Sequence, residues 1–428
     1  MHTYSAPDKP RHLATEDSDI PPVTNRDIVI VGLQPWYFKT GCNAKNIATL
    51  LAANNRVLYV NFPIKRKAYF TGNPDPKLQP HLEILRGRGE KIKPIAGNLW
   101  EFYPGSLIES VNGLPNAAAL KTMLYLVNNR NFARDIRKAI KTLGFRDVIL
   151  FNDNDIYNGF YLKELLRPSL YIYYLRDFLQ GYPYWKKHVS ALEPILIRKA
   201  DLVVANSMTY TEYSSRYNQR SYYMGQGCDF THFDASRRFP IPGDIAHLQR
   251  PLIGYIGALD SERLDIDILA HIAQNRPQWN IVLVGPEDQT FLDSPLHRMS
   301  NIHFMGARPF SQLSAYVQAF DVCINPQLIN HITRGNYPLK IDEYLAMGKP
   351  VVATRTEAMK LFQHHTLLAD RPEDYTGLIE TALAQDSPAQ AAERIRFART
   401  HSWENCMAEL YKAIYSIKNQ PHDNRSIS

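Results

Sequence analysis

The segment YPLKIDEYLAMGKPVVATRT, residues 337–356, combines a short helical pattern with a following strand. Pro338 suits the first turn of a helix that Asn336 would cap, and Gly348 would end that helix. The run PVVAT then has the β-branched, apolar character of a buried strand. This predicted helix places Lys340 in its first turn, where free backbone N–H groups and the helix dipole attract an anion.

Glu343 follows Lys340 by three residues, so the two side chains share a helix face, one turn or about 5.4 Å apart. A lysine on a diphosphate and a carboxylate that accepts from ribose hydroxyls would fit a nucleotide at this spacing. A surface ion pair between positions i and i+3 would also fit it. The spacing alone favours the ion pair. A nucleotide site can therefore be inferred only if other segments of the chain support it.

Strand-like apolar runs alternate with helical patterns along the chain, which predicts βαβ units and parallel sheets. One set begins with DIVIVGLQ at residues 27–34, and a second begins with PLIGYIGALD at residues 251–260. The predicted fold class is therefore α/β, with two doubly wound, Rossmann-like domains. Ligands of such sheets bind beyond the carboxyl ends of the strands, where the winding reverses. We expect the two domains to face one another across a cleft.

The predicted domain organisation follows these two sets of βαβ units, with a segment between them that contains prolines and a glycine. Its parts are a polar tail (1–24), an N-terminal Rossmann-like domain (25–236), a linker (237–250), a C-terminal Rossmann-like domain (251–402), a C-terminal helix packing back towards the first domain (403–419) and a frayed tail (420–428).

Composition is that of a soluble globular protein, with 45% hydrophobic and 21% charged residues among 428. No apolar run approaches the roughly 18 residues of a membrane span, and the start of the chain lacks the pattern of a secretion signal. The four cysteines lie far apart without a CxxC pair, which favours a reducing cytoplasm and no metal or redox site.

Charge is distributed unevenly along the chain. Residues 25–240 hold 30 Lys and Arg against 17 Asp and Glu, whereas residues 241–428 hold 17 against 21. A basic domain of this kind faces nucleic acid, anionic lipid or a phosphorylated substrate. Charge that serves only solubility explains the excess equally well.

The stretch PLKIDEYLAMGKPVVAT resembles the signature of GT-B retaining glycosyltransferases of family 4. The likeness extends to GYIGALDSERLDIDILAHIAQNRPQWNIVLVGP, to NIHFMGARPFSQLSAYVQAFDVCINP, and to ADLVVANS with GQGCDFTHF. It implies a GT-B fold and the transfer of a sugar from a nucleotide-sugar donor to a glycan or lipid-linked acceptor, with retention at the anomeric carbon. Bacterial envelope or exopolysaccharide assembly is the setting that the resemblance suggests.

The resemblance also implies roles for individual residues. Glu343 would bind the ribose hydroxyls and Lys340 the diphosphate, with Leu339 beside them in the same motif. Arg263 would supply a second phosphate cation. An exposed arginine paired with Glu262 or Asp265 is the alternative for that position.

Glycines and one further arginine complete the expected donor site. Gly306 to Arg308 would offer backbone groups to the base. Gly285 would let the backbone approach the ligand, although an ordinary turn at a strand end explains it nearly as well. Gly41 lies in an irregular loop that would border the sugar and the acceptor.

The chain departs from the family pattern at two positions. Gly335 stands where an earlier glutamate often contacts the donor sugar. Arg176 and Asp177 stand where a histidine is usual, so Asp177 would orient the donor sugar or the acceptor as a catalytic group, together with Lys340 and Arg263. A helix cap explains Asp177 nearly as well.

No metal and no separate cofactor are expected. The DND sequence of Asp153–Asp155 resembles a metal-binding pair, but it belongs to the first domain, away from the expected diphosphate. The leaving diphosphate can itself deprotonate the incoming hydroxyl, so the protein has to position both partners and neutralise the leaving group.

The segment NFPIKRKAYF, residues 61–70, interleaves three basic residues with aromatic ones. Such a segment can rest on an anionic membrane, at roughly 1 kcal/mol per basic residue, or it is a solvated loop. The basic first half favours contact with the inner face of a cell membrane. Nucleic acid is not an expected partner, because no known binding module is present.

Three other functions remain open at this level. A sugar-nucleotide epimerase or hydrolase would share the chemistry of Lys340 and Glu343 without an acceptor. A non-catalytic nucleotide-sugar-binding subunit gains support from Gly335. An oxidoreductase is disfavoured, because the turn after the first strand lacks the GxGxxG pattern.

Overall fold

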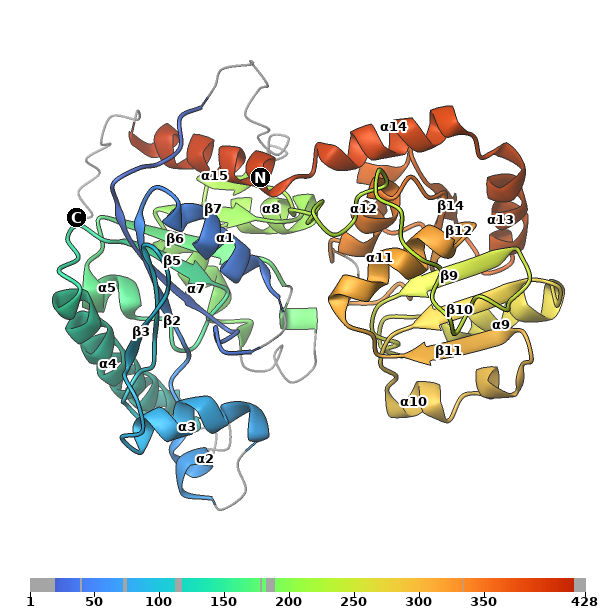
Figure 1. Cartoon of the computed structure of the whole chain (residues 1–428). Helices are drawn as coiled ribbons and strands as arrows, with labels where there is room; N and C mark the ends of the chain where they lie inside the picture. Colours follow the sequence, from blue (N-terminus) through green and yellow to red (C-terminus); the bar gives the residue numbers. More distant parts are fainter. Residues whose placement is uncertain are drawn as a thin grey trace, which may run out of the picture. The chain divides into compact units, whose positions relative to one another are not determined.

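The computed structural model describes residues 20–38, 41–71, 75–111, 118–177, 179–181, 189–333 and 335–418. The predicted C-terminal tail and most of the predicted N-terminal tail lie outside these residues. The chain forms two units: unit 1 ends at Gly225 and resumes at Met407, and unit 2 is Gln226–Cys406 (Figure 1).

Unit 1 is built on an eight-stranded sheet in the order β3-β4-β2-β1-β5-β6-β7-β8. Neighbouring strands are parallel except for the antiparallel pair β3 and β4 at one edge. The strands are β1 (Asp27–Gly32), β2 (Arg56–Val60), β3 (Ile92–Ala96), β4 (Leu99–Phe102), β5 (Ile149–Asp153), β6 (Leu170–Leu175), β7 (Leu202–Ala205) and β8 (Ser221–Tyr223). The winding reverses between β1 and β5.

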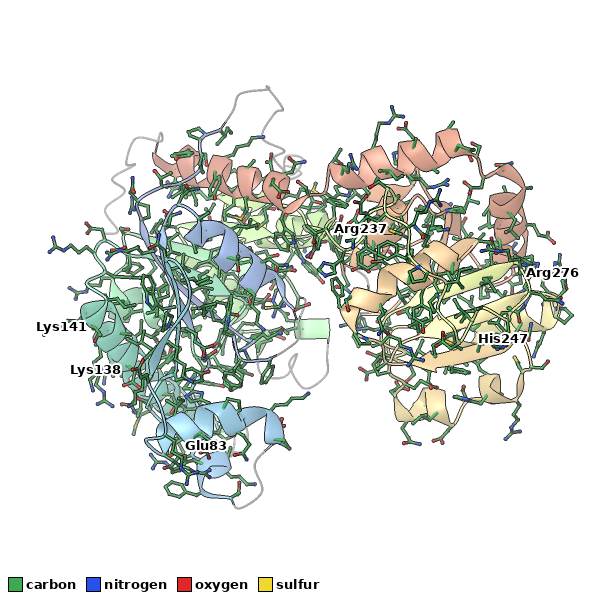
Figure 2. All side chains as sticks on the ribbon, in the orientation of Figure 1. Glu83, Lys138, Lys141, Arg237, His247 and Arg276 are labelled. Carbon is green, nitrogen blue, oxygen red and sulfur yellow. The ribbon has the colours of Figure 1, made fainter. Side chains whose placement is uncertain are left out.

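Helices flank this sheet because the buried strands are apolar on both faces. Phe132 and Ile136 of α4 pack into a core with Val29 and Leu150 of the strands, while α1 lies against β1, β2 and β4. The opposite side of α4 carries Lys138 and Lys141 into solvent, as expected for an amphipathic helix (Figure 2). The helices are α1 (Asn43–Ala52), α2 (Arg66–Phe70), α3 (Gln79–Leu85), α4 (Ala118–Thr142), α5 (Leu162–Leu166), α7 (Glu193–Lys199) and α8 (Met208–Ser215), with short 3₁₀ turns η1 (Pro76–Leu78) and η2 (Leu179–Gly181).

Unit 2 is built on a six-stranded, fully parallel sheet in the order β11-β10-β9-β12-β13-β14. The strands are β9 (Leu252–Ile256), β10 (Asn280–Val284), β11 (Ile302–Gly306), β12 (Val322–Asn325), β13 (Val351–Thr354) and β14 (Leu367–Ala369). The winding reverses between β9 and β12, which is where doubly wound sheets bind their ligands. The predicted α/β class with two doubly wound domains is confirmed.

Two apolar cores cover the two faces of this sheet. Residues of α11, α12 and α14 pack on one face, and residues of α9 and α13 pack on the other. The helices are α9 (Ile266–Asn275), α10 (Gln289–Leu292), α11 (Phe310–Ala319), α12 (Leu339–Ala346), α13 (Asp374–Gln385) and α14 (Pro388–Arg399), with 3₁₀ turns η3 (Pro295–Arg298) and η4 (Ala358–Phe362).

The segment 237–250 differs from the linker that its prolines and glycine suggested, because it packs within unit 2. The backbone N–H of Phe239 donates to Gln318 Oε1 at 2.9 Å, and Ile245 is buried in the core beneath α11. The chain passes between the units at Gly225 and again within α15 (Trp403–Lys418). In unit 1, Ser416 Oγ of α15 donates to the Tyr222 hydroxyl at 3.1 Å.

Candidate functional site

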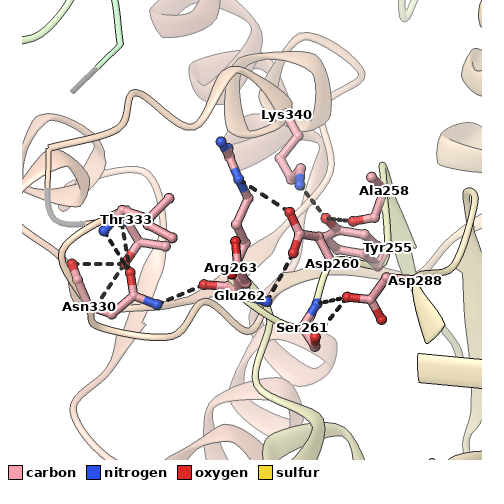
Figure 3. Close-up of polar contacts among 11 residues, drawn as sticks. Tyr255, Ala258, Asp260, Ser261, Glu262, Arg263, Asp288, Asn330, Thr333 and Lys340 are labelled. Carbon is pink, nitrogen blue, oxygen red and sulfur yellow. Dashed lines mark hydrogen bonds and ion pairs between the residues drawn. The ribbon is translucent and has the colours of Figure 1, made fainter. Parts of the chain in front are cut away.

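The loops that follow β9 and β12 meet at the point where the winding of unit 2 reverses. The N–H of Leu328 donates to the carbonyl of Arg263 at 2.9 Å, and Asn330 Nδ2 donates to the carbonyl of Glu262 at 2.7 Å (Figure 3). The turn that carries Arg263 is therefore fixed by the loop after the neighbouring strand. Both loops lie beside the start of α12.

Helix α12 begins at Leu339 with Pro338 as its N-cap. The prediction that Asn336 caps this helix is wrong, because the first helical residue is Leu339 and the N-cap position is therefore Pro338. Asn336 lies two residues earlier, and its N–H donates to the Thr333 carbonyl at 3.2 Å in the preceding turn. Tyr344 fastens the helix to the sheet, since its hydroxyl accepts from the N–H of Ile256 at the end of β9, at 2.9 Å.

Asp342 has a structural role in this helix. Its buried carboxylate accepts from the Tyr337 hydroxyl at 2.6 Å and contacts His401 Nδ1 at 2.7 Å. The bond to His401 ties α12 to the segment that follows α14. Of the three charged residues at the start of α12, Lys340 and Glu343 are therefore the candidates for ligand contact.

Lys340 extends over the end of β9, where its Nζ donates to the Tyr255 hydroxyl and lies 4.2 Å from the centre of the Tyr255 ring. Gly257 makes room for it, because a Cβ at that position would stand 3.1 Å from Nζ, and its φ of +129° also favours glycine. Burial lowers the pKa of Lys340 to about 8; the Glu343 carboxylate opposes this shift, and Arg263 adds to it.

Glu343 is half-buried one helical turn further on. Among the residues that the structure describes, its carboxylate has no hydrogen-bond or ion-pair partner. Burial raises the pKa of Glu343 to about 7, with Lys340 opposing the rise and Asp342 and Asp229 adding to it. A desolvated carboxylate of this kind is common at functional sites.

Arg263 lies in the turn after β9, with 38% of its side chain exposed. Its Nε is 3.6 Å from Asp260 Oδ2, an ion pair with a residue other than Glu262 and Asp265, the two partners that the sequence suggested. Figure 3 shows the charged ends of Arg263 and Lys340 near the carboxylate of Asp260. Two cations from separate segments thus lie at one end of β9.

Gly285 has a packing reason within the chain itself. A Cβ at this position would stand 1.9 Å from the carbonyl oxygen of Gly257, so the turns after β9 and β10 can approach only if residue 285 is a glycine. Contact between Gly285 and a ligand stays a prediction.

Gly306 and Arg308 follow β11. Gly306 has a φ of +66° and open space around its Cα. The Arg308 side chain is engaged elsewhere, since its Nη2 donates to Asp244 Oδ2 at 2.8 Å and its Nε donates to the Tyr316 hydroxyl at 2.9 Å. Only the backbone of residues 306–308 fits the predicted role towards a base.

The other predicted positions are placed as follows. Leu339 is the first residue of α12, and Gly335 is buried in the turn that precedes the helix. Gly41 is exposed before α1, with nothing within 4 Å of a Cβ built on it. Its neighbours Lys39 and Thr40 lie outside the described residues.

A second charged cluster lies at the carboxyl end of the unit 1 sheet, where the winding reverses. Asp153, the last residue of β5, is fully buried, and its Oδ1 is 2.9 Å from Nε of Arg176, which follows β6. Gly32 of β1 is the register partner of Asp153, and a Cβ on Gly32 would stand 2.8 Å from Asp153 Oδ2. Burial raises the pKa of Asp153 to about 6, against the pull of Arg176.

Asp177 lies beside this pair, with its Oδ2 3.7 Å from Arg176 Nε and 42% of its side chain exposed. Asn154, at a φ of +56°, accepts from the N–H groups of Arg176 and Asp177 at 2.9 and 3.2 Å. The pairing of Asp153 with Arg176 was not predicted from the sequence. A signal was available, since each residue directly follows or ends a buried strand of one parallel sheet.

The DND segment has structural partners for each of its side chains. Asp153 pairs with Arg176, and Asn154 accepts from the N–H of Arg176. Asp155 Oδ1 accepts from the N–H of Asn158 at 2.9 Å. Within the described ranges, no group of three or more His, Cys, Asp or Glu residues could hold a metal ion.

Residues 250–395 match the family model described as "Glycosyl transferases group 1". A curated relative of Bacillus subtilis (strain 168), "Putative teichuronic acid biosynthesis glycosyltransferase TuaH", is 25% identical over 235 residues, which cover 52% of this chain. The match spans 58% of that relative's own length. The family match contains all the predicted site residues of unit 2.

Solved structures resemble the whole chain more fully. A sucrose-phosphate synthase of Thermosynechococcus elongatus superposes with a TM-score of 0.63 at 15% identity, covering 92% of this chain and 100% of that one. Anabaena HepE in complex with UDP and glucose gives 0.60 at 15%, with coverage of 92% and 100%. A Burkholderia vietnamiensis alpha,alpha-trehalose-phosphate synthase (UDP-forming) gives 0.64 at 13%, with 93% and 98%. The fold is GT-B.

Proposed function

We propose that this GT-B protein is a glycosyltransferase that moves a sugar from a nucleotide-sugar donor to a hydroxyl of a glycan or lipid-linked acceptor, with retention at the anomeric carbon. The observation that carries the proposal is the pair Lys340 and Glu343 on the first turns of α12, at the reversal point of a domain that matches the group 1 family. One residue is a desolvated cation and the other a carboxylate without a partner among the described residues.

The donor is assigned to unit 2. Lys340 and Arg263 would neutralise the diphosphate, and Glu343 would accept from the ribose hydroxyls. The backbone of residues 306–308 would meet the base, with Leu339 and Gly285 lining the site. UDP is the first nucleotide to test, because the HepE structure is a complex with UDP.

The proposed chemistry needs no protein nucleophile. The acceptor oxygen bonds to the anomeric carbon on the face from which the diphosphate leaves, and the hydroxyl proton passes to a phosphate oxygen. Lys340 and Arg263 would stabilise the charge that develops on the leaving group. Since these cations meet the diphosphate directly, we assign no metal to the reaction.

Asp177 and Gly41 are assigned to the sugar and acceptor side in unit 1. Asp177 stands next to Arg176, whose position is set by the buried Asp153. Its exposed carboxylate would accept from a sugar hydroxyl and orient it. The four cysteines are free thiols, which is compatible with work in the cytoplasm.

The test is a transfer assay with UDP-, GDP- and ADP-sugars and oligosaccharide or polyprenyl-linked acceptors, followed by NMR of the product's anomeric proton. Transfer with retention is the expected result. Turnover of donor that is equally fast without any acceptor would instead identify an epimerase or hydrolase.

A second candidate function is a non-catalytic nucleotide-sugar-binding subunit. Gly335 favours it, because a buried glycine stands where a glutamate would otherwise contact the donor sugar. Tight binding of a donor without transfer to any acceptor in the panel would support this second function and contradict the first.

A further inference from the structure

One face of α4 is exposed along most of its length and changes character half-way. Its first half carries Leu120, Met123 and Val127, with exposed fractions of 41%, 59% and 39%. Steps of three and four residues place these side chains on a single helix face. They form an apolar stripe that faces solvent, although the opposite face of α4 is packed on the sheet.

The same face continues as a row of basic residues towards the C-terminus of the helix. Arg130, Arg134, Lys138 and Lys141 follow at steps of three and four residues, and all are exposed. Figure 2 shows Lys138 and Lys141 directed away from unit 1. The single acidic residue of α4, Asp135, is buried and accepts from the N–H of Ser106 at 2.6 Å.

Helix α2 has similar chemistry and is linked to α4 through Glu109. Arg66 pairs with Glu109, whose N–H donates to Asn128 Oδ1 of α4 at 3.0 Å. The start of α2 is thereby linked to the middle of α4. Lys65 and Lys67 are exposed there, and Phe70 at the end of α2 is 70% exposed. Lys65, Arg66 and Lys67 outnumber the carboxylates of Glu109 and Asp75 in this part of the chain.

We propose that the exposed face of α4, flanked by α2, docks on the headgroup region of an anionic lipid bilayer. An amphipathic helix with basic residues and an apolar stripe binds at the interface by burying the stripe while its cations meet lipid phosphates. A nucleic acid would use the basic row but would leave the aliphatic stripe exposed. Among the described residues no helix has the length and apolar character of a membrane span; the docking needs none.

Flotation of the full chain with lipid vesicles tests this docking, and it requires neither donor nor transfer activity. The chain should float with phosphatidylcholine vesicles that contain phosphatidylglycerol and should remain in solution with phosphatidylcholine alone. Replacing Arg134, Lys138 and Lys141 by Gln should weaken binding about fivefold per residue. Replacing Leu120, Met123 and Val127 by Ser should leave only weak binding that salt abolishes.

The matched control is Leu292→Ser with Arg298→Gln, the same substitutions at a pair of exposed residues of the same kinds in unit 2. It should bind vesicles like the wild type. All these variants change exposed side chains, so their circular dichroism and melting temperatures should be unchanged.

Two outcomes would overturn the docking. In the first, the wild type fails to float with anionic vesicles. In the second, the α4 variants bind these vesicles as the wild type does. If the chain does not float, loss of dimerisation in light scattering or loss of RNA binding in the α4 variants would show that the face serves a second copy or a nucleic acid instead.

Discussion

The two sheets place charged residues at the same topological position and use them differently. At the end of the unit 1 sheet, Asp153 and Arg176 pair with one another in a buried setting. At the end of the unit 2 sheet, and among the described residues, Lys340 contacts the hydroxyl and ring of Tyr255, and Glu343 has no hydrogen-bond or ion-pair partner.

This difference separates charges that hold a turn from charges that, in the proposed function, bind a ligand. A buried pair that satisfies itself can be broken only at a cost in stability. A desolvated charge without a strong partner lowers the stability of the unliganded protein. Binding of a ligand of opposite charge restores that stability. The reversal point of a sheet is therefore not sufficient to locate the donor; the state of the charges is needed as well.

The largest expected effect lies in unit 1. Asp153→Asn leaves Arg176 largely buried without its charge partner, and we expect a loss of about 3 kcal/mol in the free energy of unfolding. Urea denaturation measures it. UDP affinity, measured by calorimetry on the folded protein, should not change.

Two variants sharpen this prediction. Asp177→Asn should cost well under about 1 kcal/mol, since Asp177 is exposed and 3.7 Å from Arg176. Adding Arg176→Met to Asp153→Asn should recover most of the lost stability. If Asp153→Asn weakens UDP binding and leaves the free energy of unfolding unchanged, the pair Asp153–Arg176 is not structural, and the proposed difference between the two sheet ends is contradicted.

The next largest effect is in unit 2, where we expect ligand binding to weaken and stability to stay unchanged. Lys340→Met should weaken binding of nucleoside diphosphates by roughly 10- to 100-fold, because a charge-assisted contact is lost. Stability should not fall, since a desolvated cation is removed. Lys360→Met, at an exposed lysine of η4, is the matched control and should bind like the wild type.

Binding should also depend on pH in two directions. Glu343, with a pKa of about 7, must be ionised to accept from ribose hydroxyls, so affinity should fall as pH drops below 7. Lys340, with a pKa of about 8, must be protonated to hold a diphosphate, so affinity should fall as pH rises above 8. Each limb should approach tenfold per pH unit.

Calorimetry between pH 6 and pH 9.5 measures both limbs. Lys340→Arg should flatten the alkaline limb, since arginine stays charged. A wild-type affinity that is constant over this range would show that neither group contacts the ligand.

The smallest effect is expected at Arg308. Its side chain is held by Asp244 and Tyr316, and only its backbone is assigned to the base. Arg308→Ala should change UDP affinity less than twofold. A loss of tenfold or more would show that the guanidinium leaves Asp244 and binds the nucleotide.

Much of the fold could be predicted because buried parallel strands are continuous apolar runs. The runs at residues 27–34 and 251–260 both became central strands of their sheets. The start of α12 was predicted less well, since the helix begins at Leu339 and its N-cap is Pro338, two residues after the expected cap Asn336. The short strands β3 and β14 gave no clear signal, because their apolar pattern is brief.

The candidate site was predictable as far as it depends on spacing along one helix. Lys340 and Glu343 lie on the same face of α12, one turn apart, whatever surrounds them. The contact of Lys340 with Tyr255 and the space above Gly257 depend on how α12 packs on β9, which the sequence does not contain locally. The pairing of Asp153 with Arg176 likewise requires the register of β5 and β6.

One measurement tests the central claim most directly: titration of UDP and of pyrophosphate into the wild type, Lys340→Met and Glu343→Gln. If α12 holds a diphosphate on its first turn and a ribose on its second, Lys340→Met weakens both ligands, whereas Glu343→Gln weakens UDP and leaves pyrophosphate unchanged. Unchanged binding of both ligands in both variants would contradict the account.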